Sequence, residues 1–339
     1  MRALLLSAYT AVSHRHWAHG LVRHLDDVEW TLLELPPRHF RWRIRGNPLS
    51  WMLKEHEALS RDYDVVLATS MVDLATLVGL YPRLGAARRI VYFHENQFAY
   101  PESSGQRPQG EARMVNLYSA LAANQVVFNT RYNRDSFVDG ARAFLKRMPE
   151  NLPAAATLER LRERAVVLPV PIDADTAHGE TQSDGRLIIW NHRWEYDKNP
   201  EEFFAALLAL DDRGIDFELA VMGQRFRQHP PIFDAARERL AERLVAWGPQ
   251  PGERYRALLG EGAIVVSTTW HEFQGLAVME AAQRGCLPLV PDRLCFPELY
   301  AEAYRYDGTR QGLAVMEAAQ HGCLPLVPDR LCFPELYAE

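Results

Sequence analysis

The sequence predicts an α/β protein made of two doubly wound domains that face each other across a cleft. The chain has 339 residues, which is more than one hydrophobic core usually serves. Short β-branched apolar runs alternate with amphipathic helical stretches in both halves, as in folds with parallel sheets. A polar, unpatterned stretch at 173–185 separates the halves. We therefore expect one domain at 1–172, a linker at 173–185 and a second domain at 186–306.

The predicted strands and helices follow one another regularly along the chain. In the first half, we expect helices before residue 25, after residue 69 and at 116–123, and a loop at 102–111. The expected strands there are 1–8, 30–35, 64–69, 89–93, 125–129 and 166–171. In the second half, strands are expected at 187–190, 217–222, 245–248 and 263–268, and helices at 201–210, 232–244, 255–259 and 276–283.

Two polar residues follow the first predicted strand. Ser13 and His14 lie in the loop at the carboxyl end of that strand, where parallel sheets place their ligand contacts. They are candidates for the cleft. A helix-capping serine and a surface histidine are an equally good interpretation.

Four polar residues follow the predicted strand at 89–93. They are His94, Glu95, Asn96 and Gln97. Because unsatisfied polar side chains are costly in a core, we expect these four to line a surface or, preferably, the cleft.

The stretch 36–45 is the chain's only concentrated basic segment. Its arginines alternate with aromatic residues, a pattern that suits RNA backbones and unstacked bases. A strand with one solvated face would produce the same alternation, so both interpretations stay open. The residues concerned are Arg38, Phe40, Arg41, Trp42, Arg43 and Arg45.

A strand turns into a helix between residues 263 and 283. Glu272 precedes the turn, Gly275 permits it, and Glu280 lies within the helix. The first N–H groups of such a helix suit a diphosphate, and carboxylates suit sugar hydroxyls. Two glutamates at this spacing also occur by chance.

A second polar segment strengthens this interpretation. Arg193 and Lys198 lie five residues apart directly after the predicted strand 187–190. Two cations at a strand end can neutralise one pair of phosphates. Gly223, at the end of the strand 217–222, is a further candidate for this site.

Together these segments resemble the donor half of the GT-B retaining glycosyltransferases of family 4. The resemblance implies that two cations hold the nucleotide diphosphate, that one glutamate holds the transferred sugar and the other a ribose, and that a Gly-Leu step supplies N–H groups. The matching residues are, in that order, Arg193 and Lys198, Glu272, Glu280, and Gly275 with Leu276.

The first half carries a more specific resemblance. The motifs at 36–43 and 92–97, with those at 192–198 and 271–273, look like the tRNA-queuosine α-mannosyltransferase family, over residues 1 to about 306. This implies GDP-mannose as donor, no cofactor or metal, and, as acceptor, a cyclopentene hydroxyl of queuosine at the tRNA wobble position. His94 is assigned to the sugar. The acceptor residues implied are Ser13, His14, Arg41, Trp42, Arg43, Glu95, Asn96 and Gln97.

Composition sets limits on other functions. The net charge of −6 argues against a generally basic nucleic-acid coat. The four cysteines have no zinc-site spacing and suit a reducing compartment. No apolar run approaches the roughly 20 residues that span a bilayer, so we expect a cytoplasmic protein without stable membrane association. A GT-B enzyme with a lipid or glycan acceptor and a non-catalytic RNA-binding protein remain as alternatives.

The last segment nearly repeats an earlier one. Residues 311–339 copy 274–302 with a single difference, Arg284 against His321. Because Thr309 stands where the first copy has Glu272, the second copy cannot rebuild the donor site. We expect 307–339 to be an aberrant duplicate, and a chain ending near Asp307 to bind the donor equally well.

Overall fold

The computed structural model describes residues 1–339 except 101–109, 151, 174–184, 227 and 308–339. The chain divides into two compact units, Met1–Pro171 and Ile172–Glu339. The predicted loop at 102–111 falls largely outside the described residues, as do the predicted linker and the C-terminal duplicate. Of the predicted loop, Gly110 and Glu111 are described, and they begin a helix instead.

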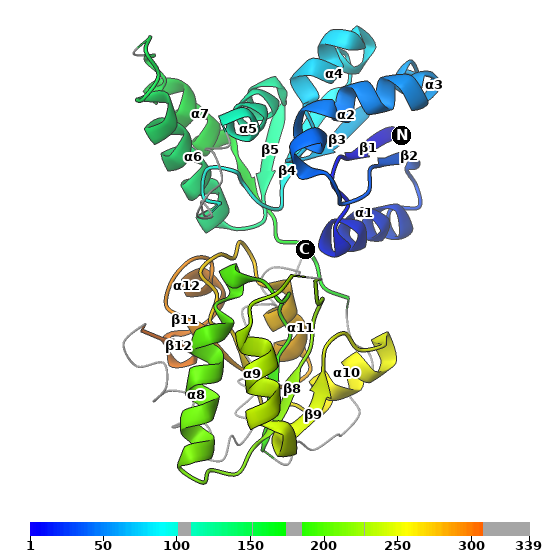
Figure 1. The fold of residues 1–339 in the computed structure, drawn as a ribbon. Helices are drawn as coiled ribbons and strands as arrows, with labels where there is room; N and C mark the ends of the chain where they lie inside the picture. Colours follow the sequence, from blue (N-terminus) through cyan, green and yellow to red (C-terminus); the bar gives the residue numbers. More distant parts are fainter. Residues whose placement is uncertain (101–109, 151, 174–184, 227, 308–339) are drawn as a thin grey trace. The chain divides into compact units, whose positions relative to one another are not determined.

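Unit 1 is a six-stranded parallel sheet surrounded by helices (Figure 1). The strand order is β2-β1-β3-β4-β5-β6. The strands are β1 (Arg2–Ser7), β2 (Glu29–Glu34), β3 (Val65–Thr69), β4 (Arg88–Phe93), β5 (Gln125–Phe128) and β6 (Val166–Val167). The helices are α1 (Val12–His24), α2 (Phe40–Lys54), α3 (His56–Leu59), α4 (Leu74–Leu80), α5 (Gly110–Ala122), α6 (Arg131–Leu145) and α7 (Ala155–Arg164), with a 3₁₀ turn at Pro82–Gly85.

Unit 2 repeats this architecture with the strand order β12-β11-β10-β7-β8-β9, again six parallel strands. The strands are β7 (Leu187–Trp190), β8 (Glu218–Val221), β9 (Leu244–Trp247), β10 (Ile264–Val266), β11 (Leu287–Pro291) and β12 (Arg305–Tyr306). The helices are α8 (Pro200–Asp212), α9 (Ile232–Arg239), α10 (Gly252–Glu261), α11 (Leu276–Gln283) and α12 (Phe296–Leu299), with 3₁₀ turns at Tyr196–Lys198, Ala241–Arg243 and Glu302–Tyr304.

Burial on both faces explains the continuous apolar strands. From Ala3 to Leu6 every side chain of β1 is fully buried, because helices cover a parallel sheet on either side. In unit 2 the core is aromatic. The Trp194 ring stacks on Phe233 with the centroids 4.1 Å apart and the planes 5° from parallel. This stacking holds the loop after β7, which contains Trp194, against the helix layer.

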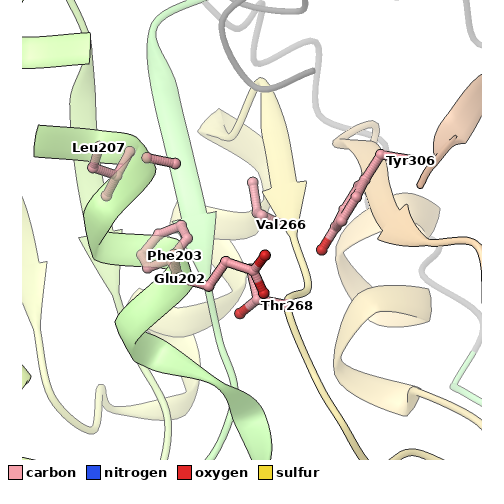
Figure 2. Close-up of a pocket in the computed structure, with 7 residues that line it drawn as sticks. Glu202, Phe203, Leu207, Val266, Thr268 and Tyr306 are labelled. Carbon is pink, nitrogen blue, oxygen red and sulfur yellow. The ribbon is translucent and has the colours of Figure 1, made fainter. Parts of the chain in front are cut away.

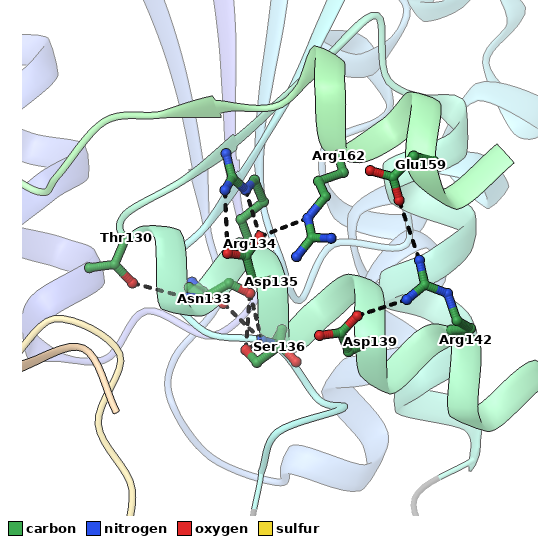
Figure 3. A network of polar contacts seen from close by, with 10 residues as sticks. Thr130, Asn133, Arg134, Asp135, Ser136, Asp139, Arg142, Glu159 and Arg162 are labelled. Carbon is green, nitrogen blue, oxygen red and sulfur yellow. Dashed lines mark hydrogen bonds and ion pairs between the residues drawn. The ribbon is translucent and has the colours of Figure 1, made fainter. Parts of the chain in front are cut away.

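Helices α6 and α7 were not anticipated from the sequence. Thr130 caps α6 by accepting a hydrogen bond from the Asn133 N–H at 3.1 Å. Asp135 on α6 then pairs with Arg162 on α7 at 2.9 Å, and Figure 3 shows this pair within a larger polar network. Exposed pairs of this kind contribute about 0–1 kcal/mol each. The network fixes how the two helices align.

Several expectations about secondary structure are wrong. The helix predicted at 232–244 ends at Arg239, and Leu244 begins β9. Two other differences have a common cause. Residues 40–45 are not an alternating strand but the first turns of α2, whose buried side chains follow a helical pattern that includes Ile44 and Trp51. The helix predicted at 116–123 begins six residues earlier, at Gly110. In both cases the buried face is shared with tertiary neighbours that the local pattern does not reveal.

Candidate donor and acceptor sites

Two loops of unit 2 meet at one edge of its sheet. Strands β7 and β10 are paired, with Ile264 opposite Ile188, so the loops that follow them are neighbours. The Trp270 N–H donates to the Asp197 carbonyl oxygen at 2.8 Å, and the Thr268 hydroxyl donates to the Lys198 carbonyl oxygen at 2.9 Å. These hydrogen bonds hold the two loops together, and both loops carry residues that the sequence assigns to donor binding.

Lys198 lies at the centre of this edge. Its side chain is only 7 % exposed, and its Nζ donates to the His271 carbonyl oxygen at 2.7 Å. The same ammonium lies 3.2 Å from Glu272 Oε2 and 3.4 Å from Asp197 Oδ2. The structure therefore brings together the lysine and the glutamate that were predicted from separate motifs, and it adds a second carboxylate.

The protonation states of this cluster are set by the charges that face each other. Burial alone would raise the pKa of Glu272, but Lys198 and His192 more than offset it and lower that pKa to about 2. Burial alone would lower the pKa of Lys198, but Glu272 and Asp197 raise it. Burial, with the charge of Lys198 second, lowers the pKa of His192 to about 4. At neutral pH the lysine is therefore charged, both carboxylates are ionised and His192 is neutral.

Arg193 lies beside this cluster but nearer the surface. Its side chain is 45 % exposed, and its Nη1 lies 2.7 Å from Glu195 Oε2. The Arg193 charge is close enough to lower the pKa of Lys198 in part. Both predicted cations thus occupy one region, and each faces a carboxylate.

Glu280 is connected to the same edge through two residues that the sequence interpretation did not assign. The Tyr255 hydroxyl donates to Glu280 Oε2 at 3.0 Å. Asn191, the residue after β7, donates through Nδ2 to the Tyr255 oxygen at 3.1 Å and to the Ala277 carbonyl oxygen at 2.8 Å. Glu280 therefore lies on the same side of unit 2 as the loop that carries Arg193. The position of Asn191 directly after a buried strand was the available signal.

Two glycines permit close backbone approaches here. Gly275 has φ 78° and is the residue before α11, which begins at Leu276, as the sequence predicted. Gly223 has φ 104°, and a Cβ on it would lie 2.1 Å from the His192 carbonyl oxygen. Only glycine fits at this second position, because a side chain would push the β8 end away from the Arg193 loop.

Unit 1 contains a buried pair of histidines. His14, in the first turn of α1, and His94, directly after β4, have ring centroids 4.2 Å apart. Trp17 meets His94 edge-on at 4.7 Å, and Tyr92 lies at 4.6 Å. Burial lowers the pKa of both histidines, and their proximity lowers that of His94 further. The alternative of a surface histidine at His14 is therefore wrong, and so is a capping role for Ser13, since Ala11 is the cap residue.

Three ring nitrogens of this histidine pair are buried without a hydrogen-bond partner among the described residues: both nitrogens of His94 and Nε2 of His14. Nδ1 of His14 lies 3.5 Å from the Ser13 hydroxyl. Buried polar atoms normally have partners, so a pair of neutral rings in this state is suited to hydrogen-bonding the hydroxyl groups of a ligand.

The other polar residues after β4 correct the sequence argument. Asn96 is fully buried, and its amide donates to Asn133 and to the Ser136 hydroxyl while its oxygen accepts from the Phe98 and Ala99 N–H groups. The claim that it cannot belong to a core is wrong, because its hydrogen bonds are satisfied within unit 1. These hydrogen bonds shape the loop, and a role of Asn96 in acceptor binding stays a prediction.

Gln97 and Glu95 have less defined roles. Gln97 is also buried, at 3 % exposure, and its N–H donates to Asn116 Oδ1 at 2.8 Å. Glu95 is half-buried, and its charge acts on His14. Of the four residues, His94 thus belongs to the histidine pair, and Glu95 acts on the pair through its charge.

The basic segment leads into α2 and forms its first turns. Arg41 and Trp42 are exposed, Arg43 is half-buried, and the Trp42 side chain is 51 % exposed. Phe40 contacts Tyr9 edge-on at 5.9 Å, so this helix begins near the loop after β1. Arg45 is not available to phosphates in the same way, because its Nη1 pairs with Asp73 Oδ2 at 2.6 Å.

A small apolar pocket elsewhere in unit 2 is not the donor site. It lies between α8 and β10 and is only about large enough for one water molecule. Figure 2 shows its lining, which is mostly core side chains such as Phe203, Leu207 and Val266. Within the described ranges, no group of three or more His, Cys, Asp or Glu residues is arranged to hold a metal ion. No helix described in the structure has the length and apolar character needed to cross a bilayer.

Comparison with known sequences decides the family. Residues 2–172 match the N-terminal domain of tRNA-queuosine alpha-mannosyltransferase. A tRNA-queuosine alpha-mannosyltransferase of Drosophila melanogaster is 34 % identical over 317 residues, which is 90 % of this chain and 83 % of the relative. The chain belongs to the tRNA-queuosine alpha-mannosyltransferase family. It is therefore a glycosyltransferase, as the sequence motifs predicted.

More distant matches are one further mannosyltransferase sequence and two solved structures. The GDP-mannose:cellobiosyl-diphosphopolyprenol alpha-mannosyltransferase of Xanthomonas oryzae is 25 % identical over 224 residues. These are 63 % of this chain and 58 % of that relative. Anabaena HepE, solved with UDP-glucose, superposes with a TM-score of 0.61 at 12 % identity. The superposition covers 93 % of this chain and 88 % of the HepE chain. TarM superposes at 0.60 with 12 % identity over 83 % of this chain, which spans about half of TarM. These likenesses show the GT-B fold with two Rossmann-like domains.

Proposed function

We propose that this member of the tRNA-queuosine alpha-mannosyltransferase family transfers mannose from GDP-mannose to a cyclopentene hydroxyl of queuosine at the tRNA wobble position, with retention of configuration. The Drosophila and Xanthomonas relatives are both named as mannosyltransferases, which supports mannose as the sugar. The observation that carries the proposal is the arrangement around Lys198, where a buried cation and two carboxylates meet beside Arg193 and the start of α11.

The chemistry of this arrangement suits a leaving diphosphate. Arg193 and Lys198 stabilise the negative charge that grows on the diphosphate as the glycosidic bond breaks, and the first N–H groups of α11 add to this. Glu272, ionised at neutral pH, accepts hydrogen bonds from mannose hydroxyls. Glu280, already a hydrogen-bond acceptor for Tyr255, accepts one from the ribose.

We further propose that the reaction needs no metal or other cofactor, because the two cations take the charge-neutralising role. Activity that is unchanged by EDTA supports this, and activity restored only by an added divalent cation contradicts it. A cytoplasmic location follows from the tRNA acceptor, and cell fractionation with a tRNA-bound marker tests it.

The neutral histidine pair supports the acceptor side of the proposal. His94 contributes ring nitrogens without partners among the described residues, and His14 lies against it. We assign His94 to the transferred sugar, and His14 with Ser13 to the acceptor hydroxyls. The exposed Arg41 and Trp42, with Arg43, contact the tRNA backbone and an unstacked base.

Incubation with GDP-mannose labelled in the sugar tests the proposed reaction. The acceptors are tRNA that contains queuosine, the same tRNA without it, and a lipid extract. Label in queuosine-containing tRNA alone supports the proposal. Label in the lipid fraction identifies a lipid-linked acceptor, and no label in any fraction indicates a non-catalytic protein.

A matched pair of variants shows whether the donor loops are responsible. Lys198→Met keeps the length of the side chain but removes its charge, and loss of about 2.7–4 kcal/mol of transition-state stabilisation is expected, by analogy with removal of an oxyanion donor. Glu253→Gln, on the exposed face of α10, is the control and should keep wild-type activity.

A further inference from the structure

Two exposed aromatic residues stand out in unit 2. Among its described residues, the large hydrophobic side chains with substantial exposure are Tyr196 at 53 %, Val245 at 37 % and Trp270 at 55 %. Both aromatic ones belong to the two loops that form the edge around Lys198. The other tryptophans of unit 2 have less exposure, and Trp190 and Trp194 are fully buried. The exposure of Trp270 and Tyr196 is therefore local to these loops.

The backbone holds the two aromatic residues on neighbouring segments. The Trp270 N–H and the Thr269 hydroxyl both donate to the carbonyl oxygen of Asp197, at 2.8 and 3.0 Å. Asp197 is the residue after Tyr196 in the 3₁₀ turn Tyr196–Lys198. The two side chains therefore extend from neighbouring loop segments at the rim of the predicted donor site.

An arginine is fixed on the Trp270 ring. The Arg293 Cζ lies 4.1 Å from the centroid of the ring, within the range of a cation–π contact. Its Nε and Nη2 donate to the Thr269 carbonyl oxygen at 3.3 and 3.1 Å, which holds the guanidinium in place. The charge of Arg293 also acts on Glu202, where it partly offsets the rise in pKa that burial causes. The half-buried guanidinium therefore lies against a ring that is more than half exposed.

The segment that presents Arg293 has an unusual backbone. Leu294, the next residue, has φ 62°, a left-handed conformation that non-glycine residues seldom adopt. Such conformations cost about 1–3 kcal/mol and persist where the surrounding structure enforces them. The loop after β11, which places Arg293 over the tryptophan, therefore carries the energetic cost of a strained backbone at Leu294.

We propose that Trp270, with Arg293 and Tyr196, forms a stacking platform for an unpaired base of the acceptor RNA at the rim of the donor site. An exposed ring offers a π-face to any base, and the neighbouring guanidinium adds attraction to the base and to its phosphate. The base concerned is one that adjoins the modified nucleotide in a single-stranded loop. This inference rests on the proposed function, because it takes an RNA acceptor for granted.

A role in binding the donor nucleotide fits these residues less well. The groups suited to the donor diphosphate and sugar are enclosed, with the Lys198 side chain 7 % and the Glu272 side chain 20 % exposed, whereas more than half of Trp270 is exposed. A ligand that stacks on Trp270 therefore approaches from the solvent side of the loops, as a macromolecular acceptor does.

The test compares five variants of the full chain, one of which, Arg293→Met, removes the charge beside the Trp270 ring. Trp270→Ala and Tyr196→Ala remove the rings, Trp270→Phe keeps an aromatic face, and Val245→Ala removes an exposed apolar side chain on β9 as the matched control. Two quantities are measured for each variant, namely the tRNA dissociation constant by filter binding and the KM for GDP-mannose. Urea unfolding midpoints establish that each variant is folded.

We expect Trp270→Ala to weaken tRNA binding about tenfold, as the loss of one stacked base implies. Trp270→Phe should recover most of this affinity, Tyr196→Ala should lose less, and Val245→Ala should match the wild type. The KM for GDP-mannose should stay within about twofold in every variant. Arg293→Met should lower the slope of log affinity against log salt concentration by about one.

Two results overturn the inference. One is a Trp270→Ala variant whose tRNA affinity equals that of the wild type. The other is a variant in which the KM for GDP-mannose rises while tRNA affinity is kept, since this assigns the ring to the donor. If tRNA binding depends on Trp270 but the protein transfers no mannose, the stacking platform stands and the proposed reaction is wrong.

Discussion

Replacing Glu272 with glutamine removes one negative charge beside Lys198 while keeping the shape of the side chain. The Glu272 carboxylate lies 3.2 Å from the Lys198 ammonium, and the side chain is 20 % exposed. A pKa lowered from 4.5 to about 2 corresponds to about 3 kcal/mol of folding stability at neutral pH. Because the folded pKa is below the unfolded one, this stability is complete above about pH 5 and is lost as the pH falls towards 2.

Urea unfolding of the wild type and Glu272→Gln, followed by tryptophan fluorescence at pH 7 and pH 3, measures this contribution. The variant should be less stable by about 3 kcal/mol at pH 7 and by about 1 kcal/mol at pH 3, because the contribution of the Glu272 carboxylate falls as the pH approaches its lowered pKa. Glu253→Gln, an exposed change on α10, should match the wild type at both pH values. A gap below about 1 kcal/mol at pH 7, or one that does not narrow in acid, refutes this description of the cluster.

Three further predictions follow from contacts in the two units. Gly223→Ala should lower the melting temperature by several degrees, because its Cβ meets a carbonyl oxygen at 2.1 Å, while Gly20→Ala on α1, with open space around it, should not. Tyr255→Phe should raise the KM for GDP-mannose severalfold and leave kcat nearly unchanged, since Glu280 loses its 3.0 Å hydrogen-bond donor. Between pH 7 and 5 the wild type should lose more thermal stability than His94→Phe. Burial lowers the pKa of His94, so below the ordinary histidine pKa protons bind the unfolded chain more readily than the folded one.

The donor half of the fold was largely readable from the sequence. The helix expected at 276–283 is α11, with Gly275 at positive φ directly before it. Lys198 and Glu272, which the sequence assigned to one site from separate motifs, lie 3.2 Å apart. Both follow from one rule, because polar residues after parallel strands converge at the carboxyl edge of the sheet, and neighbouring strands bring their loops together.

Other features depended on contacts that no local pattern contains. Asn96 is polar and follows a strand, yet it is buried, because partners on α6 satisfy its amide. The basic segment alternates like a strand but forms α2, since the tertiary packing of Ile44 and Trp51 outweighs the alternation. The link from Asn191 through Tyr255 to Glu280 joins three distant segments, so only the fold could reveal it.

A structure of the protein crystallised with GDP-mannose tests the central claim most directly. The claim predicts the diphosphate between Arg193 and Lys198 at the start of α11, the mannose hydroxyls on Glu272 and the ribose on Glu280. A nucleotide sugar bound away from these side chains, with Lys198 still enclosed by its two carboxylates, would contradict it.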